Sequence, residues 1–151
     1  MTSPTSTTIV TEFWVTGTPK PQGSKRAFQH PSTKRIVMTE AAGVPLKDWR
    51  YEIKATAVVQ MAGRPMITQP TAVMLSVEFV LPRPVSLPKT KATPLAVKKP
   101  DADKLLRAVC DSLTGVVYAD DSQIIDIRGR KRTAELGESP GAKIAVYAIS
   151  Q

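Results

Sequence analysis

The chain has 151 residues, with 21 lysines and arginines against 13 aspartates and glutamates, so its formal charge is +8 at neutral pH. A chain of this length can bury an independent core, and the excess of cations favours a polyanionic partner such as nucleic acid. A single cysteine, Cys110, excludes an intramolecular disulfide and a zinc site of paired cysteines and histidines. The single cysteine favours a reducing cytosol, so we expect a cytoplasmic protein. No apolar run is long enough to span a bilayer, and no membrane partner is expected.

The first eight residues are rich in serine and threonine and lack the basic and apolar regions of a signal peptide. They predict a disordered lead-in, followed by a single domain over residues 9–151. Residues 9–16 are rich in β-branched and aromatic side chains, which predicts a first strand that ends at Gly17.

The loop after this strand is rich in proline and glycine and carries Lys20, Lys25 and Arg26. It is not a Walker A loop, because five residues separate Gly17 from Gly23 and two prolines remove backbone N–H donors. Two interpretations stay open. The three cations form an arm that contacts DNA phosphates, or the segment is a solvated loop.

Residues 26–28 and 35–38 are short strand candidates around a segment with strong turn composition, which predicts a hairpin. The chain's one histidine, His30, lies in this turn beside a proline. We expect it to be exposed to solvent and not to act as a base or metal ligand.

Residues 45–61 predict an amphipathic helix, because their apolar positions recur every three to four residues. Trp49 belongs to this stripe and is expected in the core. The cations Lys47, Arg50 and Lys54 lie off the stripe and predict a solvated helix face.

Residues 71–81 alternate in hydrophobicity and predict a well-buried, central strand. The segment 82–100 that follows holds five cations and no acid, and prolines interrupt it. A long loop of one charge sign favours a flexible arm that binds the DNA backbone. Its candidate contacts are Lys89, Lys91, Lys98 and Lys99.

Asp101 is well placed to cap a helix over residues 103–113, and Asp103 lies in the first turn of that helix. Both carboxylates can then lie around the helix N-terminus and share one cation. The alternative is that they are ordinary N-terminal helix acids. An EF-hand loop is excluded, because Leu105 and Leu106 occupy positions that need a ligand and a glycine.

Asp103, Arg107 and Asp111 follow one another at intervals of four residues and line one side of the predicted helix. Arg107 either reaches a phosphate near the acids or belongs to a salt-bridge ladder. Asp111 is expected to be structural.

A turn with Asp120 and Asp121 follows, and residues 124–127 predict a strand that runs into four cations. This order can place metal ligands beside a track for DNA phosphates. The cations of the track are Arg128, Arg130, Lys131 and Arg132. Residues 142–149 predict the last strand. The fold class is therefore α/β of the α+β type, a small mixed sheet with helices 45–61 and 103–113 packed against it.

Residues 98–126 closely resemble the signature of the RusA family of Holliday junction resolvases, which runs Pro-Asp-x-Asp-Asn-Leu-x-Lys-x-x-x-Asp-x-Leu and then Asp-Asp-x-Gln. The Pro-Lys-Pro-Gln-Gly-Ser-Lys-Arg loop also resembles the family's N-terminal segment. The resemblance implies that Asp101, Asp103 and Asp121 are catalytic and bind metal, with Asp120 as the accompanying acid.

Two positions depart from the pattern, since Arg107 stands at the family's catalytic lysine and Lys104 at its asparagine. Arginine keeps the charge but not the shape or the accessible pKa of lysine, which favours electrostatic stabilisation over proton transfer. Lys104 can contact a phosphate or pair with a neighbouring acid.

The resemblance implies a homodimer that resolves four-way DNA junctions by paired nicks in recombination and repair, with Mg²⁺ as cofactor and Mn²⁺ as a possible substitute. No small-molecule cofactor is expected, and no serine or cysteine nucleophile set is evident in the sequence. Two alternatives stay open. One is an inactive protein of the same fold that binds branched DNA, and the other is a nuclease for flaps or other branched DNA.

Overall fold

The structure is a computed structural model that describes residues 4–23, 25–29, 36–40 and 44–151. Its main sheet has four strands in the order β1-β6-β4-β5. The strands are β1 (Ser6–Thr16), β4 (Ala72–Leu81), β5 (Ile124–Thr133) and β6 (Gly141–Ser150). β6 pairs antiparallel with β1 and β4, whereas β4 and β5 are parallel, so the predicted small mixed sheet is confirmed.

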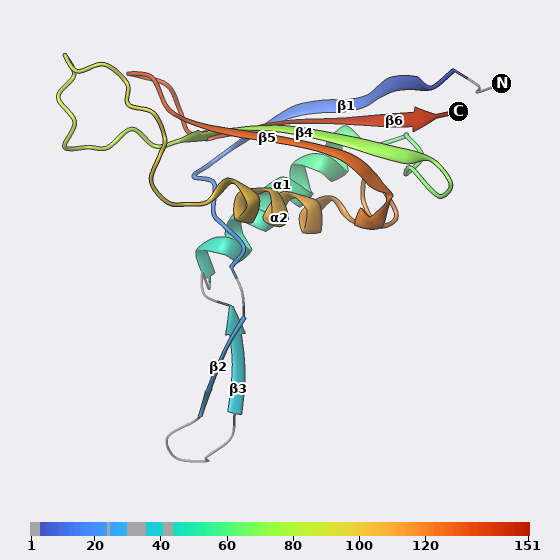
Figure 1. Cartoon of the computed structure of the whole chain (residues 1–151), viewed down its shortest axis with the longest axis horizontal. Helices are drawn as coiled ribbons and strands as arrows, with labels where there is room; N and C mark the ends of the chain where they lie inside the picture. The colour runs from blue at the N-terminus through green and yellow to red at the C-terminus, as the bar shows by residue number, and fades with distance from the viewer. Residues whose placement is uncertain (1–3, 24, 30–35, 41–43) are drawn as a thin grey trace.

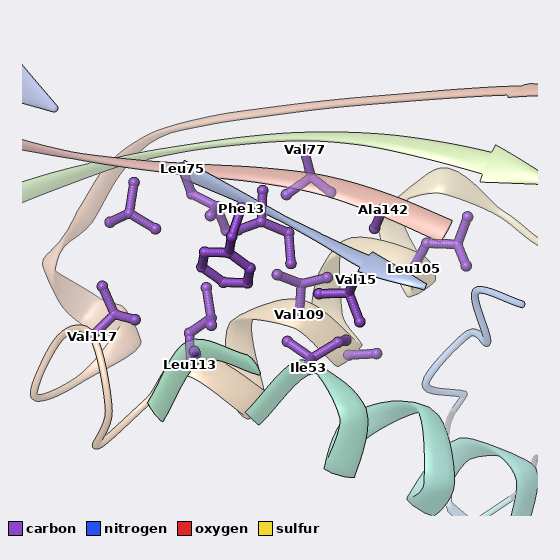
Figure 2. Packing of buried hydrophobic residues seen from close by; sticks show 14 of the residues in the cluster. Phe13, Val15, Ile53, Leu75, Val77, Leu105, Val109, Leu113, Val117 and Ala142 are labelled. Carbon is purple, nitrogen blue, oxygen red and sulfur yellow. The ribbon is translucent and has the colours of Figure 1, made fainter. Parts of the chain in front are cut away.

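Two helices, α1 (Val44–Gln60) and α2 (Ala102–Leu113), lie on the same face of this sheet (Figure 1). The core fills the space between the two layers. Figure 2 shows Phe13 and Val77 of the sheet above Ile53 of α1 and Val109 of α2. The apolar stripe predicted for α1 is buried, and Trp49 is only 3% exposed. The α+β class and both predicted helices are confirmed.

β4 lies between β6 and β5, as predicted for the most apolar strand, and its side chains toward the helices are fully buried. Its parallel partner β5 is reached through α2, because parallel neighbours cannot be joined by a tight turn. Gly129 of β5 lies under α2, and a Cβ there would come within 2.5 Å of Leu106. The helix that carries the candidate acids is therefore seated directly on β5.

A second, two-stranded sheet is formed by β2 (Lys25–Gln29) and β3 (Ile36–Glu40), which extend away from the main sheet beyond the helices (Figure 1). The predicted hairpin is confirmed. Its turn, including His30, lies outside the described residues.

Two predicted boundaries need correction. Ser6 to Thr8 belong to β1 and pair with residues 148–150, so the disordered lead-in predicted for residues 1–8 is too long. β5 continues through the whole cationic run to Thr133, because that run stays paired with β4 as far as Leu81. Within the described parts of the chain, no helix is long and apolar enough to span a membrane.

Candidate active site

Asp101 and Asp103 are exposed at the start of α2, which is where the sequence predicted them. Asp101 is the N-cap residue, but its side chain makes no capping hydrogen bond. Its carboxylate lies 3.7 Å from the Lys104 ammonium, so the pairing of Lys104 with a neighbouring acid is confirmed. Both groups are about half exposed, which leaves the carboxylate accessible to a ligand.

Lys131 fixes the backbone that leads into these acids. Its ammonium donates to the carbonyl oxygens of Lys98 at 2.7 Å and Pro100 at 2.8 Å. Alternation along β5 turns Lys131 toward the helices, whereas its neighbours Arg130 and Arg132 point the other way. The sequence predicts Lys131 as a DNA contact, whereas in the structure its ammonium holds the backbone next to Asp101.

Arg107 lies in the middle of α2 and is exposed. Over the described ranges its guanidinium makes no hydrogen bond or ion pair, although Asp103 and Asp111 are each four residues away. The alternative of a salt-bridge ladder is therefore not what the structure shows. A guanidinium without an intramolecular partner is available for a phosphate.

Asp120 and Asp121 are exposed at the start of a short 3-10 helix, η1 (Asp121–Gln123). The buried Gln123 side chain holds this turn from below, since it donates to the carbonyl oxygens of Ile67 at 3.3 Å and Thr71 at 3.1 Å and accepts from the Asp120 N–H at 2.9 Å. Gln123 is a positioning residue that the sequence analysis missed. The Asp-Asp-x-Gln motif itself was the available signal.

The acids form two groups and not one. Figure 1 shows the chain passing along α2 and reaching η1 beyond its C-terminal end, opposite the end that begins at Asp101. Burial, followed by the charges of Asp121 and Asp111, raises the pKa of Cys110 to about 11, so both carboxylates lie within electrostatic range of that thiol. Cys110 is about 10 Å further along the helix axis than Asp103. Among the described residues, no three His, Cys, Asp or Glu side chains are close enough to hold a metal ion.

Asp111 lies near the second group and makes a structural contact, in keeping with the structural role predicted for it. The Gln22 side-chain amide donates to its carboxylate, and the Gln22 backbone N–H donates to the Lys104 carbonyl oxygen at 3.0 Å. The loop after β1 is therefore docked along α2 and is not a free arm. No sequence signal linked Gln22 to Asp111, because 89 positions separate them.

The segment 82–100 has no helix or strand but is folded around Arg83. The Arg83 guanidinium donates to the Thr93 hydroxyl at 2.8 Å and to the Lys91 carbonyl oxygen at 2.7 Å, and the Thr93 hydroxyl donates to Glu135 at 2.6 Å. These bonds replace the predicted flexible arm with a tethered loop. Its Lys89, Lys91, Lys98 and Lys99 side chains are exposed.

A hollow of about 400 Å³ on the outer sheet face is lined mainly by charged and polar side chains. A larger and more apolar hollow of about 730 Å³ lies beside this loop. Lys20, Lys98 and Lys99 line the larger hollow, so the structure brings these three predicted DNA contacts together. Lys25 and Arg26 lie in β2, and their side chains are outside the described part of the structure.

The remaining cations of β5 point away from the helices and form ion pairs on the outer face. Arg128 pairs with Asp126 at 3.1 Å, Arg130 with Glu78 at 3.4 Å, and Arg132 with Glu138 at 2.6 Å. They do not share a face with the acids of α2, so the predicted phosphate track is not assembled beside them. DNA contact by these three arginines stays a prediction.

The donor chemistry at the start of α2 fits a hard divalent cation. Mg²⁺ binds oxygen ligands and commonly takes only one or two protein carboxylates, with water and substrate phosphates completing its shell. Asp101 and Asp103 supply such exposed oxygens at the end of a helix. Asp120 and Asp121, the other acids of the predicted metal set, belong to the second group, so the four predicted ligands do not form one cluster among the described residues.

Comparison with known proteins agrees with these features. The family model described as Endodeoxyribonuclease RusA matches residues 16–147 of the chain. A Bacillus subtilis (strain 168) protein named "Uncharacterized protein YqaN" is 28% identical over 147 residues, covering 92% of this chain and 96% of that protein. The match to the family model includes both groups of acids, Arg107 and Gln123.

Proposed function

The chain belongs to the RusA endodeoxyribonuclease family, and from this premise we propose that it resolves four-way DNA junctions by paired, metal-dependent nicks. The observation that carries the proposal is the exposed surface of α2, where Asp103 and an Arg107 without a partner among the described residues lie one turn apart. A carboxylate for a cation and a guanidinium for a phosphate are the two groups that phosphodiester hydrolysis requires here.

Asp101 and Asp103 would hold Mg²⁺, or Mn²⁺ in its place, at the N-terminus of α2. When bound, the ion would polarise a phosphoryl oxygen and lower the pKa of a coordinated water. Asp121 would bind metal beyond the C-terminal end of α2, with Asp120 as the accompanying acid. Gln123 keeps both carboxylates of this turn exposed by holding its backbone.

Arg107 would bind the phosphate under attack and stabilise the charge that develops on its oxygens. Its permanent charge suits this role, whereas a lysine could also transfer a proton. Lys104 would compete with the cation for Asp101, since its ammonium already lies 3.7 Å from that carboxylate.

DNA would approach along the helical face, next to the hollow that Lys20, Lys98 and Lys99 line. Lys89 and Lys91, on the same loop, would extend this contact along the backbone. The predicted homodimer belongs to the proposal too, because two copies related by a two-fold axis would present two sets of acids to the two symmetric strands of a junction.

The test is cleavage of a labelled mobile four-way junction beside a linear duplex of matched sequence, each with Mg²⁺ and with EDTA. Symmetric nicks in the junction, dependent on Mg²⁺ and absent from the duplex, are the expected result. Equal cleavage of both substrates, or of flaps in preference to junctions, would replace resolution by a broader nuclease activity.

The separation of the acids into two groups favours one alternative, a protein of the same family that binds branched DNA without cutting it. Such a protein would bind the junction with equal affinity in Mg²⁺ and EDTA and would leave it intact. In that case Arg107→Lys is the informative variant, because it restores the residue that the family pattern has at this position.

A further inference from the structure

α1 separates its charges by sign. Because successive helix residues are turned by about 100°, Lys47, Arg50 and Lys54 project within one narrow sector. The acids Asp48 and Glu52 project on the other side of the helix. A helix face that only contacts solvent has no need to separate positive from negative side chains. The prediction that these cations form a solvated face therefore does not explain why the acids lie on the other side of α1.

The cationic sector faces α2 across a shallow groove of about 250 Å³. Its lining consists of Lys47, Arg50, Tyr51 and Lys54 from α1 and Asp111 and Ser112 from α2. Cations outnumber acids three to one in this lining. Lys47, Tyr51 and Lys54 are exposed, and the Tyr51 side chain is 69% accessible.

The groove reaches the side of α2 that carries the candidate residues, because Asp111 is part of its lining. Asp111, at its edge, lies one helical turn from Arg107 and two turns from Asp103 along the same side of α2. The Asp111 carboxylate accepts a hydrogen bond from Gln22, so part of its charge is already engaged by the protein. A polyanion that lies in the groove and extends along this side of α2 would meet Arg107 one helical turn away.

We propose that the groove between α1 and α2 binds the phosphodiester backbone of the DNA strand next to the phosphate that is cut. The exposed ammonium groups of Lys47 and Lys54 place two positive charges along one side of the groove, and each can neutralise a phosphate of a DNA strand. The exposed Tyr51 ring adds a flat surface for a sugar or an unpaired base, as in proteins that track single strands. The inference rests on the proposed function only in taking DNA as the ligand.

The test compares the double variant Lys47→Ala/Lys54→Ala with a control, Lys143→Ala/Arg64→Ala, that removes the same charge elsewhere. Lys143 lies on the outer face of the sheet and Arg64 beyond the end of α1. Binding to an uncut four-way junction is measured in EDTA at several salt concentrations, after thermal melting has shown that both variants fold.

Loss of two phosphate contacts should lower affinity on the order of tenfold near 100 mM salt and reduce the slope of log affinity against log salt by about 2. The control should stay close to the parent chain. An equal loss of junction affinity in both variants would mean that only the total charge matters, which would overturn the inference. So would wild-type binding by the groove variant, or a change in its oligomeric state, which would identify a second copy as the occupant.

The two proposals fail separately. A parent chain that never cuts, while the groove variant alone loses affinity, would end the resolvase proposal and retain the groove. Normal cutting by the parent with unchanged binding by the groove variant would do the reverse.

Discussion

Lys131 donates its ammonium to the carbonyl oxygen of Pro100 at 2.8 Å, one residue before Asp101. A second hydrogen bond, to the Lys98 carbonyl oxygen, holds the same segment, so one lysine of β5 anchors the backbone that leads into α2. The first prediction tests this positioning role against the phosphate contact that the sequence suggested.

Lys131→Met should lower junction cleavage roughly 10- to 100-fold, the usual effect of losing a group that orients a metal ligand. Junction affinity should stay within about twofold of the parent, because the ammonium is engaged by the protein backbone. Both quantities are measured with Lys143→Met as the control. If the variant binds the junction more weakly but cleaves bound junction at the normal rate, Lys131 contacts DNA and does not position the acids.

Asp103→Asn should keep junction binding and reduce cleavage by on the order of 100-fold, equivalent to about 2.7 kcal/mol of transition-state stabilisation. The substitution preserves shape and removes only the charge. Single-turnover cleavage with saturating protein separates the two effects, and the exposed Asp48→Asn on α1 serves as the matched control. Undiminished cleavage would remove Asp103 from the site.

Gln123→Ala should destabilise the protein by about 1–3 kcal/mol, because the Thr71 carbonyl oxygen loses the side-chain donor and the Ile67 carbonyl oxygen keeps only the Ala119 N–H. Urea unfolding measures this change. The neighbouring exposed Ser122→Ala should change stability by no more than about 0.5 kcal/mol. If both variants unfold alike, the turn is held by other contacts.

Gly129→Ala should cost about 1–3 kcal/mol, since the added methyl group overlaps the Leu106 side chain under α2. Leu106→Ala removes the obstacle, so the double variant should be more stable than the sum of the two single changes predicts. Additive losses in denaturant unfolding would show that the helix shifts away from β5 independently of Leu106.

Glu138 provides a pH prediction on the outer face. Its hydrogen bonds with the Arg132 guanidinium, followed by one from the Glu135 backbone N–H, lower the pKa of Glu138 from 4.5 to about 2. A carboxyl whose pKa is lower in the folded state stabilises the fold above the ordinary pKa, and this contribution is lost as pH falls from 4.5 toward 2. The stability difference between the parent and Glu138→Gln should therefore be constant near pH 6 and shrink below about pH 4. Parallel melting curves over this range would contradict it.

Local patterns were sufficient to predict most of the fold. The alternation of residues 71–81 and the apolar stripe around Trp49 correspond to β4 and α1, because burial on one face imposes its period on the sequence. These local patterns do not predict the order of the strands in the sheet. It depends on pairings such as Val77 with Ile144, between segments far apart in the chain.

The candidate site shows the same division. The two pairs of acids were found by their motif, but their separation along α2 was not, since a motif carries no distance. The cationic run of β5 was taken as one track, yet its pairing with β4 sends Lys131 to one face and Arg130 to the other. Successive residues of a strand point to opposite faces of the sheet, and the register of β5 against β4 decides which face each cation takes. Of these β5 cations, only Lys131 thereby lies near Asp101.

The parallel pairing of β4 and β5 also affects when the candidate site can form during synthesis of the chain. α2 is the crossover between them, and Gly129 seats it only after β5 has joined the sheet. Closing this non-local contact is a slow kind of folding event compared with forming a helix. A nascent chain that has left the ribosome as far as α2 therefore carries every residue of the Asp-x-Asp signature without the scaffold that aims it. The proposed cleavage of DNA would therefore arise only after β5 has been synthesised and has joined the sheet.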